Sequence, residues 1–256
     1  MSRLAPLPRA ACGAEFNALL SLTEQVMGYV PNSMLIMARD PDLLAAFAQL
    51  SAVVVLRPGR VDAGLKALIM QIASQVAGCR YCAAHSGNLA AARGVAPAKV
   101  AALWDYETSP LFSDLERAVL RVAQNAARSP SDVTDQDFAA VRRFLDDDQI
   151  IELVAVIAFM GFLNRWNDTL ATSLEPAPRA FAERYLVAGG WTIGLHGGGA
   201  EATPIARRAQ PIRVRVIMWL LKKWAPRSKF SALGCRRLTS SPALHCAPRQ
   251  RCFLTD

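Results

Sequence analysis

The chain has 256 residues, of which 52% are hydrophobic and 20% charged. This apolar content excludes a wholly disordered protein, and the length allows one large domain or a domain with an extension. Residues 1–200 carry 17 basic and 19 acidic side chains and residues 201–256 carry 12 and 2, so the formal net charge of +8 comes from the tail. The first 200 residues therefore offer no electropositive surface for nucleic acid, and we expect none to bind there.

Helix start and stop signals recur along the first 200 residues. Asp40 followed by Pro41 is typical of a helix N-terminus, and Gly94 and Pro97 mark the end of one helix and the start of the next. Apolar side chains recur at helical spacing between these signals. They include Leu43, Leu44, Phe47, Leu50 and Val54, and then Val61, Leu65, Leu68, Ile72 and Val76.

Two further caps follow along the chain. Ser113 and Glu116 form a capping box, and Asp148 is expected to cap a helix over residues 150–163. The most apolar stretch, residues 153–163, is shorter than the roughly 20 residues that span a membrane, so we expect a buried core helix and no transmembrane segment. Hairpin turns and long alternating patterns are not found. The sequence therefore predicts an all-α bundle of about eight helices.

The composition changes near residue 200. We expect residues 1–200 to form a helical domain and residues 201–256 to form a basic, largely disordered tail. Residues 214–224 can instead form a short basic amphipathic helix that contacts an anionic membrane surface or a partner groove. A shifted reading frame would also produce such a segment. No apolar run follows the first residues, so we expect no secretory signal and a cytoplasmic location.

Two cysteines three positions apart, Cys79 and Cys82, open a predicted helix, and His85 follows within a turn. Residues i and i+3 share a helix face, with Cβ atoms about 5–6 Å apart, so the sulfurs can form and open a disulfide without refolding. In a reducing cytoplasm such a pair is typical of catalysis or metal binding. We therefore predict thiol redox chemistry here.

Helix geometry assigns roles within this pair. In helical projection His85 neighbours Cys82 and not Cys79, and a helix N-terminus favours a thiolate. We predict that the Cys82 thiolate attacks a hydroperoxide, that Cys79 condenses with the sulfenic acid, and that an external dithiol reduces the resulting disulfide. The prediction requires that an oxidant from solvent reaches the sulfurs.

Other interpretations of these residues compete with redox chemistry. Small cysteines also pack in buried helices without any chemistry. Cys79, Cys82 and His85 can supply three zinc ligands, but successive turns of one helix do not surround an ion, and no second Cys or His cluster completes the site. We expect neither a metal nor a nucleotide cofactor, since the glycine run at residues 197–199 follows no strand. The polar residues 164–168 either line a pocket or subunit contact or form a helix C-terminus.

The run from Gly78 to His85, with the sequence GCRYCAAH, resembles the signature of the carboxymuconolactone decarboxylase superfamily, in particular its alkylhydroperoxidase-D-like members. Residues 108–113 and 162–169 also resemble segments of members that carry a C-R-Y-C variant. The resemblance covers about residues 10–197, including Gly190 and Trp191 near its end. It implies an all-helical fold, a homo-oligomer, and peroxidase or thiol–disulfide activity. In the family pattern the second cysteine, here Cys82, forms the sulfenic acid and the first, here Cys79, resolves it.

Two positions depart from that pattern. Ala67 stands where the family has its relay glutamate, and Ser86 stands where it has its relay histidine. His85 is then the substitute imidazole, and the carboxylate must come from elsewhere, with Glu152 and Asp168 as candidates. Two alternative functions remain: a lyase acting on a lactone acid, which would survive loss of either cysteine, and a non-enzymatic redox-responsive helical interaction protein.

Overall fold

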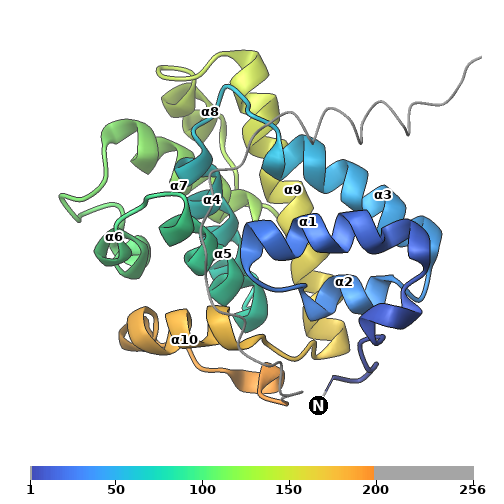
Figure 1. The fold of residues 1–256 in the computed structure, drawn as a ribbon. Helices are drawn as coiled ribbons and strands as arrows, with labels where there is room; N and C mark the ends of the chain where they lie inside the picture. Colours follow the sequence, from blue (N-terminus) through green and yellow to red (C-terminus); the bar gives the residue numbers. More distant parts are fainter. Residues whose placement is uncertain (1, 199–256) are drawn as a thin grey trace, which may run out of the picture. The chain divides into compact units, whose positions relative to one another are not determined.

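The computed structural model describes residues 2–198, which form helices and loops without a strand (Figure 1). The α-helices of this part of the chain are α1 Asn17–Met27, α2 Asn32–Met37, α3 Pro41–Ser51, α4 Ala63–Val76, α5 Arg80–Ala92, α6 Pro97–Ala101, α7 Asp114–Ala126, α8 Asp135–Val141, α9 Asp147–Leu170 and α10 Pro176–Tyr185. Short 3-10 or π-helical turns accompany them: η1 Arg9–Ala11, η2 Ala14–Phe16, η3 Ala52–Leu56, η4 Leu103–Asp105, η5 Val187–Gly189 and η6 Gly194–His196.

The predicted all-α class is confirmed. The number of helices in residues 2–198 exceeds the expected eight because short helices such as α2 and α6 carry too few residues to show a periodic pattern. The predicted tail, residues 201–256, lies outside the described residues together with its candidate helix over residues 214–224.

Helix α9 lies at the centre of the described fold, between α1–α3 on one side and α4 and α5 on the other (Figure 1). Its buried residues Leu153 and Met160 belong to a large apolar cluster shared with α4, α5 and α7. Further along, Leu163 and Trp166 pack against a smaller cluster formed around α1–α3. Because α9 contributes to both clusters, its C-terminal half is held firmly against the start of α5, where the cysteine pair lies.

Local side-chain chemistry fixes the helix ends. The Asp40 Oδ1 accepts from the Leu43 backbone N at 3.1 Å, and Ser113 and Glu116 form the predicted capping box of α7. The predicted cap of α9 is wrong. Asp146, not Asp148, caps α9, because only Asp146 has a glutamine three residues later, and Gln149 completes a capping box with it.

Helix α9 also extends beyond the predicted end at residue 163 and continues to Leu170. By length and composition it is apolar enough to cross a membrane, with a mean hydropathy of 1.4, and 39% of that stretch is buried within the described structure. Buried core helices of other proteins can be equally long and apolar, so length and hydropathy do not decide between a membrane and a protein core. The expected absence of a transmembrane segment stays a prediction.

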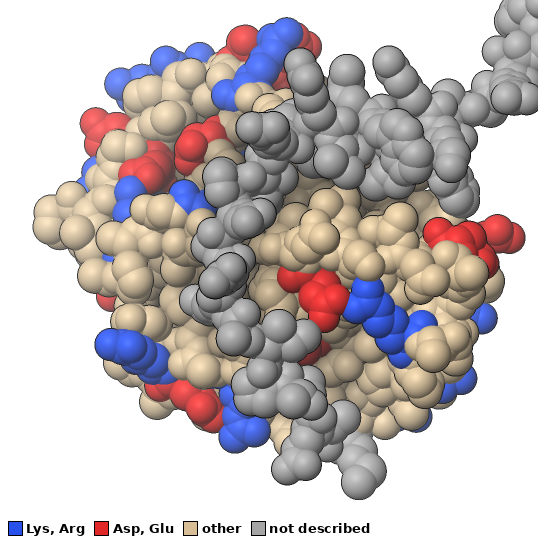
Figure 2. Space-filling view, in the orientation of Figure 1, with Lys and Arg blue, Asp and Glu red and all other residues tan. Residues whose placement is uncertain are grey.

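Charged side chains are interspersed on the face drawn in Figure 2. On its described part, small groups of Lys and Arg lie beside Asp and Glu, among larger uncharged areas. Elsewhere among residues 2–198, ion pairs such as Arg121 with Glu107 and Arg60 with Asp148 also bring opposite charges together. The described part of this face therefore shows no extended basic patch, in line with the nearly balanced charge of the first 200 residues.

We expect Leu153→Ala to lower the free energy of unfolding by about 2–5 kcal/mol, because Leu153 is 1% exposed within the large apolar cluster and its removal leaves a cavity. Leu111→Ala is the matched control, since Leu111 is 46% exposed, and its effect should stay within about 0.5 kcal/mol. Urea unfolding of both variants measures the difference. Equal effects would show that α9 is not the central packing element.

Candidate functional site

The cysteine pair lies at the junction of α4 and α5. Gly78 has a φ of 77°, in the left-handed region that glycine tolerates, and turns the chain so that Cys79 becomes the N-cap of α5. The Cys79 Sγ accepts a hydrogen bond from the Cys82 backbone N at 3.4 Å. Both cysteines are free thiols. The two sulfurs are therefore held at the positive end of the α5 dipole.

The pair is almost completely buried. Cys79 is 0% exposed and Cys82 is 3% exposed. A pocket of about 210 Å³ reaches Cys79, and its lining includes Arg80, Trp104 and Trp191 but not Cys82. The pocket therefore ends beside Cys79, but the predicted reaction of either sulfur with an oxidant from solvent requires the surrounding side chains to move.

Asn167 of α9 contacts the second cysteine. Its Nδ2 donates to the Cys82 Sγ at 3.4 Å and to the Leu163 carbonyl at 3.0 Å, and the residue is 1% exposed. A donor directed at sulfur stabilises negative charge on it. Asn167 thus contacts the cysteine pair, while Trp166 packs against the smaller apolar cluster. That residues 164–168 line a pocket or a subunit contact stays a prediction.

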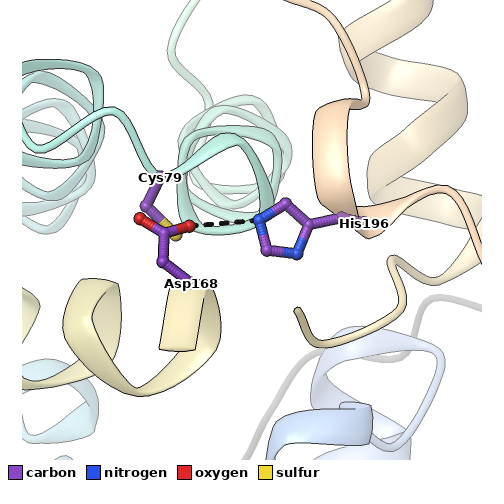
Figure 3. Close-up of side chains that lie close together, drawn as sticks. All are labelled: Cys79, Asp168 and His196. Atoms are coloured by element: carbon purple, nitrogen blue, oxygen red, sulfur yellow. Dashed lines mark hydrogen bonds and ion pairs between the residues drawn. The ribbon is translucent and has the colours of Figure 1, made fainter. Parts of the chain in front are cut away.

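A second group of side chains converges on Cys79. Figure 3 shows Cys79, Asp168 and His196, which come from the N-cap of α5, from α9 and from η6. Their sulfur, oxygen and nitrogen atoms all lie within 4.8 Å of one another. The His196 Nε2 lies 3.2 Å from the Asp168 Oδ1, and its Nδ1 lies 2.7 Å from the Thr172 carbonyl oxygen. Because a carbonyl only accepts, Nδ1 carries a proton and Nε2 faces the acid and the thiol.

This environment changes the protonation of both groups. Burial lowers the pKa of His196, but hydrogen bonds to Asp168, Cys79 and Thr172 outweigh burial and raise the pKa to about 9. A hydrogen bond to the Cys82 side chain, burial and the charge of Cys82 raise the pKa of Cys79 far above its usual range. At neutral pH, Cys79 is thus a neutral thiol beside an imidazolium ion that Asp168 stabilises.

The raised pKa of His196 predicts how stability depends on pH. A histidine that binds its proton more tightly in the folded state stabilises the fold fully below its unfolded pKa of 6.5, and this contribution disappears as pH rises through about 9. We therefore expect the free energy of unfolding to fall between these two pH values in the parent and to change less in His196→Gln. Urea titrations at each pH measure this difference, and parallel profiles for the two proteins would contradict it.

The predicted residue His85 lies in a separate hydrogen-bond network. Its Nε2 lies 2.6 Å from the Glu175 Oε2, and its Nδ1 lies 3.1 Å from the Tyr29 hydroxyl. Glu175 is 3% exposed and also accepts from the Tyr81 hydroxyl at 2.8 Å. Burial, followed by the charge of Glu175, raises the pKa of Tyr81, so this phenol stays a neutral donor.

Among the described residues, the hydrogen bonds of His85 reach neither cysteine. Its predicted role beside Cys82 stays a prediction, whereas the imidazole that does contact the pair is His196, which the sequence analysis did not select. The Tyr81 ring lies between the two histidines, with centroid distances of 4.3 Å to His85 and 5.7 Å to His196.

The structure separates the two candidate acids. Glu152, near the start of α9, pairs with Lys66 and accepts from the backbone N of Arg60 at 2.9 Å. The partners that the Glu152 carboxylate contacts therefore do not include the cysteines. Asp168 instead lies in the cluster with Cys79, so it is the carboxylate at the pair. Ala67 and Ser86, the two positions that depart from the family pattern, are both buried and offer neither a carboxylate nor an imidazole.

Residues 41–125 match the sequence model of the carboxymuconolactone decarboxylase family. The protein YnjA of Escherichia coli (strain K12) is 28% identical over 110 residues, which are 43% of this chain and 60% of that protein. The match therefore spans less than two thirds of that relative.

Solved structures share the fold of this chain. The apo form of the debrominase Bmp8 is 33% identical, with a TM-score of 0.66, and the match covers 71% of this chain and 96% of Bmp8. A cysteine-to-alanine variant of Bmp8 in complex with 2,3,4-tribromopyrrole matches with 32% identity. The alkylhydroperoxidase AhpD core protein from Ralstonia eutropha JMP134 is 23% identical, with a TM-score of 0.63, over 71% of this chain and 95% of that one. This last likeness confirms the alkylhydroperoxidase-D-like fold.

Proposed function

Because the chain belongs to the carboxymuconolactone decarboxylase family, with a debrominase among its structural relatives, we propose that it is an enzyme that reduces hydroperoxides with a pair of thiols. One observation carries the proposal: two free thiols lie in contact at the N-terminus of α5, and each sulfur has its own polar partners. The Asn167 amide donates to the Cys82 sulfur, and the His196 imidazole and the Asp168 carboxylate lie beside the Cys79 sulfur. Such an arrangement supports both thiolate formation and proton transfer.

The proposed cycle starts at Cys82. Its thiolate, stabilised by Asn167 and the α5 N-terminus, attacks the terminal oxygen of a hydroperoxide, the O–O bond breaks, and the alkoxide takes a proton to leave as an alcohol. The Cys82 sulfenic acid then reacts with Cys79, which loses its proton to the fraction of His196 that is neutral, and water leaves. One hydroperoxide and two thiols thus yield one alcohol, one water and one disulfide. An external dithiol reduces the disulfide and approaches it through the pocket that Cys79 lines, after the side chains that cover the sulfur move.

A second candidate reaction is reductive debromination. Bmp8, a debrominase, is 33% identical over 96% of its length. The pocket beside Cys79 is lined by Trp104 and Trp191, whose rings suit a flat aromatic substrate. In this reaction a thiolate takes bromine from carbon, the carbon takes a proton, and the second thiol displaces bromide to form the same disulfide. The two reactions differ in the electrophile and share the thiol cycle.

The lyase alternative is equally consistent with the family, and it needs neither cysteine. The enzymes among the relatives favour a catalyst over a purely redox-responsive interaction protein. A cycle that ends in a disulfide also needs a reducing compartment to run again, and for this reason we propose a cytoplasmic location.

The direct test counts thiols in the full-length chain before and after one equivalent of cumene hydroperoxide, and then measures turnover with dithiothreitol. We expect two thiols to disappear and turnover to be continuous. Cys12→Ser is the control, because Cys12 is a buried thiol in a separate cluster, and it should behave like the parent. Unchanged thiols with hydroperoxide but loss of two thiols with 2,3,4-tribromopyrrole would favour the debrominase. Unchanged thiols with both would refute the thiol cycle.

We also propose that the chain forms a homo-oligomer through the exposed face of α9. Ile151 is 70% exposed, Val154 41% and Phe162 40%, and these apolar side chains lie on one side of the helix. Val154→Arg should therefore shift the sedimentation coefficient of the parent oligomer toward that of a monomer. Leu111→Arg, at a residue that is 46% exposed in a loop, is the matched control. A parent that sediments as a monomer would contradict the proposal.

A further inference from the structure

The cluster of Cys79, Asp168 and His196 has the composition of a metal site. Sulfur, carboxylate oxygen and imidazole nitrogen are the three ligand types that zinc-class ions take from proteins. The three residues come from separate segments, the N-cap of α5, the end of α9 and η6, and converge from different directions (Figure 3). These three ligands differ from Cys79, Cys82 and His85, which lie on one helix and cannot surround an ion. Ligands from three separate segments can surround one.

Distances within the cluster fit such an ion. Metal–ligand distances of about 2.0 Å place neighbouring N and O ligands of a tetrahedral site about 3.3 Å apart. The His196 Nε2 and the Asp168 Oδ1 are separated by 3.2 Å, and the Cys79 Sγ lies within 4.8 Å of both. A Zn–S bond of about 2.3 Å places sulfur about 3.5 Å from the other ligand atoms of a tetrahedral site. The Cys79 sulfur would therefore move by up to about 1.3 Å, which rotation about its Cα–Cβ bond allows.

The outer contacts of the cluster also match a metal site. Metal-binding histidines usually donate their second ring N–H to a backbone carbonyl or a carboxylate, which fixes the ring and leaves the other nitrogen free to coordinate. His196 makes such a contact from Nδ1 to the Thr172 carbonyl oxygen at 2.7 Å, and Nε2 points into the cluster. Cys79 also lines the pocket, which gives an ion a route to the sulfur.

We propose that the reduced protein binds a thiophilic divalent cation of the zinc class through the Cys79 Sγ, the His196 Nε2 and an Asp168 carboxylate oxygen. Binding displaces the thiol proton of Cys79 and the Nε2 proton of His196 to solvent. The fourth position takes a water molecule, because the three protein ligands leave it open. The ion occupies the sulfur and the imidazole that the thiol cycle needs.

Metal binding and disulfide formation therefore exclude one another. A disulfide between Cys79 and Cys82 consumes the sulfur ligand and releases the ion, and a bound ion holds the pair reduced. This regulatory consequence rests on the proposed function, whereas the binding of the ion does not.

The test uses cobalt(II), whose bond to a thiolate gives a near-ultraviolet charge-transfer band. The protein is the reduced full-length chain carrying Cys235→Ser, Cys246→Ser and Cys252→Ser, so that the cysteines of residues 201–256 contribute no signal. We expect one equivalent of cobalt to saturate the band and zinc to displace it. His196→Ala and Asp168→Ala should each weaken binding at least about tenfold. His85→Ala and Cys12→Ser should leave the cobalt titration unchanged.

The outcomes separate the two proposals. Absence of a stoichiometric thiolate band, or a band that His196→Ala leaves unchanged while far-ultraviolet circular dichroism shows an intact fold, would overturn the metal site. Oxidation with diamide should form the disulfide and release cobalt, and a band that persists in the disulfide form would overturn it as well. If cobalt binds as expected but neither hydroperoxide nor tribromopyrrole oxidises the pair, the metal site stands and the proposed function fails.

Discussion

Replacing Cys82 with serine is expected to lower dithiol-dependent hydroperoxide turnover at least about 10³-fold, the scale seen when a catalytic nucleophile is removed. Cys79→Ser should instead complete one turnover and stop with a sulfenic acid on Cys82. The difference follows from the contacts of the two sulfurs. Asn167 donates to the Cys82 sulfur, whereas the pKa of Cys79 is raised by its hydrogen bond to the Cys82 side chain and by burial, so Cys79 remains a thiol until a base removes its proton.

Dimedone labelling followed by mass spectrometry distinguishes the two variants. After one equivalent of hydroperoxide, Cys79→Ser should carry one dimedone adduct at Cys82, and Cys82→Ser should carry none. The structure also supplies an argument for the reverse order, because Cys79 lines the pocket and Cys82 does not. An adduct at Cys79 in Cys82→Ser would therefore exchange the two roles while preserving the thiol cycle. Cleavage of a lactone acid by a variant that lacks both cysteines would favour the lyase.

The fold followed from the sequence because its signals are local. Asp40, Ser113 and Gly94 each end or begin a helix through atoms within four residues, so the chain order alone reveals them. The misplaced cap of α9 had a local signal as well. Three aspartates in a row compete for that position, and the glutamine at residue 149 selects Asp146 because a capping box requires a spacing of three.

The site was only half predictable, because half of it depends on contacts between distant segments. The C-x-x-C spacing identifies Cys79 and Cys82, and helix geometry makes His85 the natural imidazole. His196 lies far along the chain, after α10, and reaches Cys79 only because α10 and the turn at η6 return to the N-terminus of α5. The sequence held one signal for it: His196 is the only other histidine of the first 200 residues, and Asp168 was already a candidate acid.

Replacing His196 with glutamine should slow disulfide formation about 10²-fold, the usual contribution of a general base, and should change the first oxidation of Cys82 much less. The reason is that His196 contacts the thiol that resolves the sulfenic acid, and Asp168 stabilises the imidazolium that forms when it takes the proton. Trp191 lines the same pocket and donates to the Arg80 carbonyl at 3.0 Å, so stopped-flow tryptophan fluorescence can follow both steps.

If His196 acts as a base, the rate of disulfide formation depends on its protonation, whereas a residue that only packs does not change this pH dependence. In the parent, the rate of disulfide formation should rise with pH as His196 loses its proton near pH 9, because only the neutral imidazole accepts the Cys79 proton. His196→Gln should lose this rise and depend on solvent hydroxide alone, and Asp168→Asn should shift the rise to lower pH because the imidazolium has lost its acceptor. His85→Gln is the control, since His85 pairs with Glu175 and not with the thiols. If His85→Gln abolishes the rise while His196→Gln retains it, the roles of the two histidines are the reverse of those proposed, and the network of Tyr29 and Glu175 belongs to the catalytic site.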